Sequence, residues 1–346
     1  MTKHWLLLAA LFAVAACDDG SSPNPVNAPI GETPEDGDGG GDGGDGGGIE
    51  GGGVGLPGTD DPATDEGLFR REARDEGGNG FAEQISYDPD SDTFAVDNLG
   101  FDGDNVFTRD AGAPNLGGPF RVYESAAFFP DGATGRQIEQ LPHKLLYGVA
   151  PSGNLEFAIV RTGGYVEFGF GGFIYQRNEG VTLPTSGQAS YAGDYAGLRD
   201  FAGRGGLEYT FGKMTMDIDF EDFNDGDAVK AEIFDRSIFD LQGNDVTADV
   251  LAALGAENNR TFTELPVMRF VIGPGVLTEN GEITGQLNSF VTDAGGAAQQ
   301  FEAGNYYAVI GGEQAEEVVG VVVVTSDDPR FEGVTARETG GFVLER

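Results

Sequence analysis

Cysteine and histidine are scarce in this sequence, and their scarcity excludes several kinds of chemistry. Cys17 is the one cysteine among 346 residues, so no internal disulfide can form. The two histidines are His4 and His143, and His4 lies in an N-terminal segment that we expect to be removed. Zinc sites built from His and Cys, and a Cys–His nucleophile, are therefore excluded. A Ser–His–Asp triad would have to use His143, but no Gly-x-Ser-x-Gly elbow accompanies it. We expect a structural histidine, no enzyme and no cofactor.

Basic side chains and long apolar runs are also few. Lys and Arg number 20 against 58 Asp and Glu, which gives a formal net charge of −38. A field of this sign repels phosphate backbones, so we expect no nucleic-acid partner. Two explanations fit the acidic composition, namely solubility at an exposed surface or an acidic face that evolved for one basic partner. We favour the first. Beyond the N-terminus, no stretch approaches the roughly 18 consecutive apolar residues that suggest a spanning helix.

The N-terminus carries the one clear apolar run. Residues 5–16, "WLLLAALFAVAA", form twelve consecutive apolar positions, which suits the core of a secretory signal. The segment "VAAC" at 14–17 resembles the bacterial lipobox, which implies diacylglycerol on the Cys17 sulfur and cleavage after Ala16. We therefore predict a lipoprotein-type signal peptide at 1–16 and a bilayer partner held through acylated Cys17. The alternative is an ordinary signal peptide that contains a cysteine.

Glycine and acidic residues dominate the segment that follows. Residues 17–79 contain few apolar side chains, and the extreme is "EDGDGGGDGGDGGG" at 35–48. Such a composition cannot bury enough apolar area to offset backbone entropy, so we predict a disordered spacer. Its expected role is to hold the folded part away from the membrane.

The remainder reads as short strands between glycine-rich turns. Leu155, Phe157 and Ile159 alternate with Glu156 and Ala158, which is typical of a half-buried strand after the hairpin signal "PSGN" at 151–154. A second alternation places one set of side chains on a single face: Met214, Met216, Ile218 and Phe220. One helix is expected over 247–256, with Thr247 as its cap. The pattern indicates an all-β barrel or sandwich, with two β-domains at 80–185 and 186–346.

Carboxylates and aromatic residues mark no definite site. The run "DIDFEDFNDGD" at 217–227 fails the EF-hand spacing, so we predict no metal site beyond a weak, non-specific cation site at Asp222–Asp227. A glycosidase pair of carboxylates is not marked by anything in the sequence. Four aromatic residues next to glycines either pack in the core, which we favour, or line a ligand cavity: Tyr191, Tyr195, Phe201 and Tyr209.

Several motifs in the last half resemble one family of proteins. These are "QASYAGDYAG", "GGLEYTFGKMTMDIDFEDFNDG", "GEITGQLNSF" and "FEAGNYYAVIGGEQAEEVVGVVVV". They resemble the β-barrel domain of transferrin-binding protein B-like surface lipoproteins. The resemblance covers 186–346, and 80–185 resembles the preceding handle domain more loosely. The matching positions, which we interpret as structural, are Tyr191, Gly193, Tyr195, Gly304, Tyr306, Tyr307, Gly311, Ala315, Glu316, Glu317 and Gly320.

The resemblance implies a fold and a class of function. The fold would be all-β, with an N-terminal antiparallel handle-like domain followed by an eight-stranded antiparallel β-barrel. The function would be that of a lipid-anchored cell-envelope binding protein that captures a protein, haem or a small solute. The alternative is a structural or interaction lipoprotein without a soluble ligand. The expected location is the surface of the bacterial outer membrane, although Asp18 after the acylated cysteine would favour inner-membrane retention in enterobacteria. No ligand-binding residue is transferred.

Overall fold

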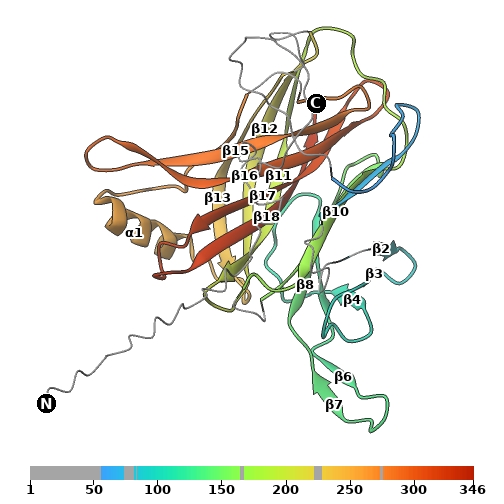
Figure 1. Cartoon of the computed structure of the whole chain (residues 1–346), viewed down its shortest axis with the longest axis vertical. Helices are drawn as coiled ribbons and strands as arrows, with labels where there is room; N and C mark the ends of the chain where they lie inside the picture. The colour runs from blue at the N-terminus through green and yellow to red at the C-terminus, as the bar shows by residue number, and fades with distance from the viewer. Residues whose placement is uncertain (1–55, 74–81, 83, 164–166, 222–227, 273–275) are drawn as a thin grey trace, which may run out of the picture.

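The computed structural model describes residues 56–73, 82, 84–163, 167–221, 228–272 and 276–346. Several sequence predictions fall outside these ranges, namely the signal peptide, the lipid-bearing Cys17, most of the spacer and the cation site at Asp222–Asp227. Within the described part of the chain, no helix is both long and apolar enough to cross a membrane. The described residues form two large β-sheet bodies that pack together, with one small hairpin and one helix beside them (Figure 1).

The first body is an open antiparallel sheet of eight strands, which we call the handle. Its strand order is β1-β10-β9-β8-β5-β4-β3-β2. A separate hairpin, β6 (Phe128–Pro130) with β7 (Gln137–Glu139), projects away from it (Figure 1). The handle strands are β1 (Leu68–Arg71), β2 (Ile85–Asp88), β3 (Thr93–Val96), β4 (Val106–Arg109), β5 (Phe120–Ser125), β8 (His143–Val149), β9 (Leu155–Thr162) and β10 (Gly171–Arg177).

Strand β1 lies inside the range 17–79 that the composition predicts to be disordered. That prediction is wrong for residues 68–71, because they pair with β10 along the edge of the handle. Leu68 is buried there, and residues 57–59 add backbone hydrogen bonds to the outer edge of β1. A short apolar stretch within an acidic segment is therefore enough to complete a sheet that the rest of the chain supplies.

The second body is a closed antiparallel barrel, as the sequence predicts. Strand β11 pairs with both β12 and β18, which closes the ring of eight strands. The confirmed fold is thus a handle-like sheet followed by an eight-stranded barrel. The barrel strands are β11 (Gln188–Ala202), β12 (Glu208–Asp219), β13 (Ala228–Asp240), β14 (Met268–Phe270), β15 (Glu282–Thr292), β16 (Ala298–Gly311), β17 (Glu317–Asp327) and β18 (Thr335–Glu345).

The helix between β13 and β14 forms where the sequence predicts it, but its cap differs. Helix α1 spans Thr247–Asn258, and the residue at its N-cap is Val246. Thr247 makes no capping bond, because its hydroxyl accepts a hydrogen bond from the backbone N–H of Ile238. Asp245 instead accepts a bond from the Thr247 backbone N–H. The threonine therefore fastens the start of α1 to β13 rather than capping the helix.

Strand β9 also departs from the sequence prediction. Leu155, Phe157 and Ile159 are buried as expected, but Ala158 on the opposite face is only 1% exposed. Only Glu156 is partly exposed on that face. The prediction of a half-buried strand is wrong because β9 is central in the handle, with one face against the barrel and the other inside the curve of its own sheet. The alternation predicted for β12 is confirmed.

Candidate functional site

Apolar side chains fill one half of the barrel interior. Tyr195 and Tyr306 are fully buried there, and the ring of Phe270 stacks on Tyr306 at a centroid distance of 3.7 Å. Two glycines make room for these tyrosines, because a Cβ at Gly340 would lie 2.1 Å from the Tyr195 hydroxyl and one at Gly285 would lie 2.4 Å from that of Tyr306. Glycines on the neighbouring strand therefore allow large rings to pack inside a narrow barrel.

Paired charges fill the other half of the interior. Arg236 donates two hydrogen bonds to the Glu302 carboxylate at 2.8 and 2.7 Å, and Glu302 also accepts one from the Ser289 hydroxyl. The hydroxyl of Tyr195 donates to Glu338 Oε1 at 2.6 Å, which joins the apolar layer to the charged one. These bonds pair the buried charges with one another, as burial requires, although Arg236 Nε has no hydrogen-bond partner.

The charged layer continues to the end of the barrel. Arg199 and Arg330 both contact Glu208, at 2.8 Å each, and Arg330 also pairs with Asp328 at 2.6 Å. The guanidinium of Arg204 packs over the ring of Phe201, 3.8 Å from its centroid. Consequently, the interior holds its own ion pairs along its length beyond the tyrosines.

Electrostatics keep the ionic states of this layer fixed. Burial opposes the charge on Arg236, but the Glu302 and Glu338 carboxylates outweigh it and raise the pKa of that guanidinium above its usual value. Burial and the neighbouring Glu338 raise the pKa of the Tyr195 hydroxyl well above its usual value. Tyr195 therefore stays a neutral donor, and Arg236 stays a cation, throughout the physiological range.

Buried arginines fasten the handle to the barrel. Arg70 on β1 forms a two-point pair with Glu282 on β15, at 2.6 and 2.7 Å. Arg161 on β9 is fully buried and contacts both Glu72 and the Thr339 hydroxyl of β18. Charge-assisted bonds of this kind fix orientation as well as distance. The handle is therefore held in one position against the barrel wall.

A third arginine crosses the same interface through carbonyl groups. Arg177 on β10 donates to the backbone oxygens of Asn280 and Ile310, at 2.8 and 2.9 Å. Because burial is the main influence, the pKa of Arg177 is lowered from its usual value. Sequence reasoning missed these interface arginines. Their signal is a basic residue inside an apolar strand, as in "AIVRTG", in a chain with few basic residues.

Two glycines of the barrel form seats for handle side chains. A Cβ at Gly341 would lie 2.2 Å from the Phe157 ring, and one at Gly311 would lie 2.3 Å from Leu155 Cδ1. The motif residue Glu317 adds a polar contact, because it accepts hydrogen bonds from the backbone N–H and hydroxyl of Ser152, the first at 3.0 Å. These parts of the family-like motif therefore lie at the handle–barrel interface.

The other motif positions lie in the barrel wall and its turns. The Tyr191 hydroxyl donates to the carbonyl oxygen of Ala315 at 2.7 Å, and Ala315 has a left-handed backbone with φ 56°. Glu316 accepts a bond from the Gln314 backbone N–H in the same turn. The remaining motif residues are buried or small positions of the strands: Gly193, Gly304, Tyr307 and Gly320.

The four aromatic residues for which the sequence allows either a core or a cavity position are all core residues. Tyr191 and Tyr195 belong to the apolar cluster inside the barrel, Tyr209 to the cluster between barrel and handle, and Phe201 to a small cluster with Val334. Each is at most 2% exposed.

His143 is also buried, within the handle. Its ring Nδ1 lies 3.0 Å from the Leu141 carbonyl oxygen, and the ring lies edge-on to Phe107. Burial lowers the pKa of His143 to about 4. The neutral imidazole is thus a packed core group.

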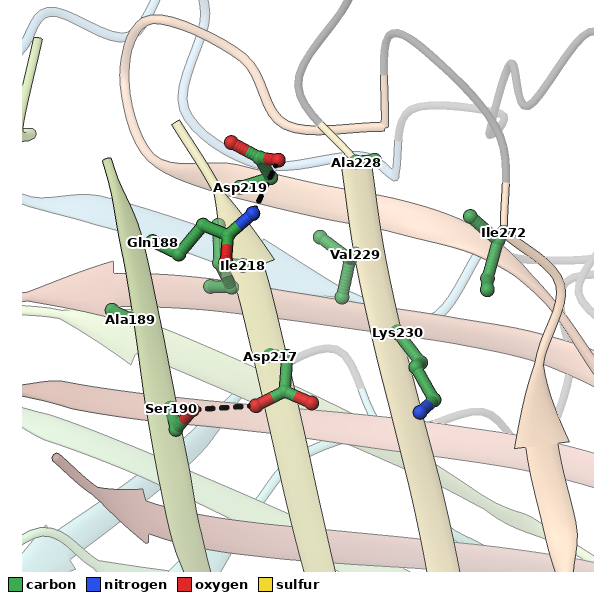
Figure 2. A pocket seen from close by; sticks show the side chains of 10 residues that line it. All are labelled: Gln188, Ala189, Ser190, Asp217, Ile218, Asp219, Ala228, Val229, Lys230 and Ile272. Atoms are coloured by element: carbon green, nitrogen blue, oxygen red, sulfur yellow. Dashed lines mark hydrogen bonds between the residues drawn. The ribbon is translucent and has the colours of Figure 1, made fainter. Parts of the chain in front are cut away.

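A groove of about 400 Å³ crosses the ends of β11, β12 and β13 (Figure 2). Two carboxylates of β12 line this groove, and each accepts a hydrogen bond from a side chain of β11. Asp217 accepts from the Ser190 hydroxyl at 2.6 Å, and Asp219 accepts from the Gln188 amide at 2.9 Å. Ile272, which is 44% exposed, lies beyond β13 on the far side of the groove. Both carboxylates lie on the polar face of β12, as the alternation predicts.

The described residues contain no group of three or more His, Cys, Asp or Glu side chains arranged to hold a metal ion. The weak cation site that the sequence suggests at Asp222–Asp227 lies outside these residues. Asp217 and Asp219 instead take their hydrogen bonds from side chains of the adjacent strand.

Comparison with known proteins gives structural similarities only. No protein-family model and no curated protein matches this chain. Among solved structures, a double mutant of transferrin-binding protein B from Haemophilus parasuis is similar at 10% identity and a TM-score of 0.38. That match covers 76% of this chain and 42% of the other.

Two further structures are similar in the same way. Intact Ap-TbpB, with N and C lobes, has 12% identity and a TM-score of 0.32, over 70% of this chain and 44% of the other. A surface lipoprotein has 10% identity and a TM-score of 0.28, over 55% of this chain and 76% of the other. This chain thus spans less than half the length of the transferrin-binding proteins that it matches. At these scores the likeness transfers no residue and no partner.

Proposed function

We propose that this chain is a lipid-anchored cell-envelope binding protein that holds a protein partner on its outer surface. The observation that carries the proposal is the filled interior of the barrel. Tyrosines and methionines occupy one half, and the Arg236–Glu302 and Arg199–Glu208 pairs occupy the other. With the interior occupied by its own side chains, the outer faces of the barrel and handle remain for binding.

A haem or small solute inside the barrel is disfavoured by the same pairs. To admit such a ligand, the barrel would have to separate buried ion partners, and an uncompensated buried charge costs about 3–5 kcal/mol. The groove near Asp217 combines carboxylates with an exposed Ile272, which suits the mixed chemistry of a polypeptide surface. A protein partner therefore fits this chain better than a solute inside the barrel.

The anchor in this proposal comes from the sequence. Acylation of Cys17 would bury long alkyl chains, each CH₂ contributing about 0.8 kcal/mol, and several chains hold a protein on a bilayer without a spanning helix. The acidic spacer would then place the handle and barrel away from the membrane. We propose the outer surface of the bacterial outer membrane as the location.

The second candidate function is a structural or interaction lipoprotein of the envelope without a soluble ligand. The filled barrel favours it too, because a packed interior needs no ligand to be stable. The two candidates differ in whether the outer surface binds one partner saturably.

The binding test uses the secreted form of the chain, residues 18–346, immobilised and exposed to extracellular proteins. Captured proteins are identified by mass spectrometry, purified and titrated by calorimetry. We expect one protein to bind saturably at a fixed ratio, and added haemin to give no shifted absorption band. Saturable haemin binding would overturn the choice of a protein partner. Absence of any saturable protein would favour the structural alternative.

The anchor is tested in the producing cell by substituting Cys17→Ser. We expect the wild type to fractionate with the outer membrane and to be cleaved by protease added to intact cells. The variant should lose acyl chains and leave the membrane fraction. Asp18→Ser serves as the matched control, because it alters the retention signal and keeps the thiol. A membrane-bound, acylated Cys17→Ser protein would contradict the anchor.

A further inference from the structure

A second cavity lies in the handle, away from the barrel groove. Its volume is about 460 Å³, and it lies between strand β2 on one side and strands β9 and β10 on the other. The two sides meet because the sheet curves, so that residues from its end at β2 face residues from β9 and β10. We call this cavity the handle groove. The side chains used below are Tyr87, Phe94, Tyr147, Glu156 and Gln176.

Aromatic rings form one wall of the handle groove. The rings of Tyr87 and Tyr147 are stacked, with centroids 5.5 Å apart and planes 23° apart, and both lie close to Phe94, at 4.9 and 5.0 Å. Phe94 and Tyr147 are buried, whereas Tyr87 is 38% exposed. The outer ring of the stack therefore presents aromatic surface to a ligand.

The position of the Tyr87 ring is fixed by a carboxylate behind it. The hydroxyl of Tyr87 donates to Asp92 Oδ1 at 3.0 Å, and the hydroxyl of Tyr123 donates to the same oxygen at 2.6 Å. These hydrogen bonds lower the pKa of Asp92, the one from Tyr123 most strongly. An ionised carboxylate bonded to the phenol makes the ring more electron-rich and thus a better surface for a cation.

Glu156 lies in the handle groove beside the aromatic wall, in contact with Tyr147. Its carboxylate is oriented by three donors, the Tyr147 hydroxyl on Oε2 and the amides of Gln176 and Asn178 on Oε1, at 2.5, 2.5 and 3.4 Å. A carboxylate offers about four acceptor positions, two on each oxygen, so Oε2 can accept a further bond from a ligand. Among the described residues, those that line the groove include this carboxylate and no Lys or Arg. Its charge is therefore not balanced by a lining residue.

We propose that the handle groove receives an arginine or lysine side chain of the protein partner, and this inference rests on the proposed function. The cationic head would lie against the exposed face of Tyr87 and donate to Glu156. The alkyl stem of the same side chain would contact Phe94 and Ile174, which suits the apolar part of the groove. The aromatic face, the Glu156 carboxylate and the absence of a cation among the described lining residues together favour a positive ligand.

The overall acidity of the chain does not by itself explain a cation site at the handle groove. A net charge of −38 attracts any cation to any part of the surface and does so weakly in salt. The handle groove differs because its carboxylate is held by three donors beside an aromatic wall. A test must therefore separate the groove from the general field.

The test titrates residues 18–346 with the blocked tripeptide acetyl-Gly-Arg-Gly-amide at 0.15 M salt, a value at which exposed charges are screened beyond about 8 Å. Binding is followed by calorimetry and by NMR of ring-labelled tyrosines. We expect Glu156→Gln to weaken binding about tenfold, because it removes a charge-assisted bond and keeps the shape. Tyr87→Ala should weaken it about fivefold. Glu313→Gln, which removes an exposed carboxylate from the turn before β17, outside both grooves, should leave binding unchanged.

Three outcomes would overturn the proposal. One is equal weakening by Glu156→Gln and Glu313→Gln, which would assign binding to the general field. Another is tight binding of acetyl-Gly-Leu-Gly-amide, which would make the groove an apolar site. A third is binding of methyl glycosides in place of the tripeptide, which would assign it to sugars.

The proposed function can fail or stand independently of this result. If the captured protein binds wild type and Glu156→Gln equally, the handle groove is not its site and surface capture remains. If no protein is captured at all, the tripeptide titration still decides whether the groove takes a cation.

Discussion

The pair of Arg236 and Glu302 is the most demanding contact at the scale of single residues. Arg236 is 5% and Glu302 is 6% exposed, and both hydrogen bonds between them are shorter than 3 Å. Burying two charges is costly, and their attraction offsets that cost only while both are present. The pair therefore fixes the packing of the barrel interior more than it adds to its stability.

The first prediction removes one partner of this pair. Glu302→Gln leaves the buried Arg236 charge with a carboxylate only at 3.6 Å, in Glu338, and a bond to the Pro266 carbonyl oxygen, so the free energy of unfolding should fall by about 3–5 kcal/mol. Urea denaturation measures the change. Glu232→Gln is the matched control, because Glu232 pairs with Arg269 on the exposed face of neighbouring strands and should cost at most about 1 kcal/mol. Equal losses in the two variants would contradict the account.

His143 gives a prediction for pH. Its pKa is about 4 in the folded chain, against 6.5 for an ordinary histidine, because burial disfavours the charged ring. Between these values the unfolded chain binds more protons, so stability falls as the pH falls from about 6.5 to about 4. The loss from this one group is about 3 kcal/mol.

The measurement compares the pH dependence of urea denaturation in the wild type and in His143→Leu. The variant should lose stability with falling pH less steeply, by the amount that His143 contributes. Its absolute stability is not the readout, since replacing the ring also changes packing around Phe107. Parallel curves for the two proteins between pH 7 and pH 4 would show that the histidine is protonated in the folded state.

At the scale of elements, the close packing of β9 against β18 is a main contact between the handle and the barrel. Phe157 lies over Gly341, where a Cβ would be 2.2 Å from its ring. Gly341→Ala should therefore destabilise the protein by about 1–3 kcal/mol through overpacking. Adding Phe157→Leu should make the loss at Gly341 smaller, because the two positions touch and their effects are not additive.

A glycine in open space supplies the control for this double-mutant cycle. A Cβ at Gly132 would meet nothing within 4 Å beyond its own chain neighbours, so Gly132→Ala should change stability by less than about 0.5 kcal/mol. Additive effects of Gly341→Ala and Phe157→Leu in thermal denaturation would mean that the two side chains do not meet in solution.

The two alternating strands show how far local pattern reaches at this scale. In β12 the pattern predicts both faces correctly, because one face lines the barrel and the other, from Lys213 to Asp219, meets water. In β9 the same period predicts one exposed face wrongly, because other strands of the curved handle sheet cover the face of Ala158. A two-residue alternation of side chains identifies a strand and assigns each residue to one of its two faces. Whether one face or both are buried depends on what packs against the strand.

At the scale of the whole molecule, handle and barrel share buried ion pairs and apolar area. We expect them to unfold together in one calorimetric transition, because Arg70–Glu282 and Arg161 with Glu72 and Thr339 lie at their junction. Glu282→Gln removes the charge that balances Arg70 and should separate the transition into two, with the handle unfolding first. Glu232→Gln, on the exposed barrel face, should keep one transition. Two transitions in the wild type would contradict a firmly docked handle.

The sequence by itself determined what depends on neighbouring residues. Strand periods, glycine turns and the hairpin at 151–154 predict an all-β barrel or sandwich, because these signals act over a few positions. The choice of a closed eight-stranded barrel came from the resemblance of longer motifs to one family. The tertiary structure alone decided which distant residues meet. Arg70 and Glu282 are 212 positions apart, and the handle groove forms only because a curved sheet brings Tyr87 toward Glu156. Pairing over such distances depends on the closure of sheets and on which charges are buried together, and no local period records either.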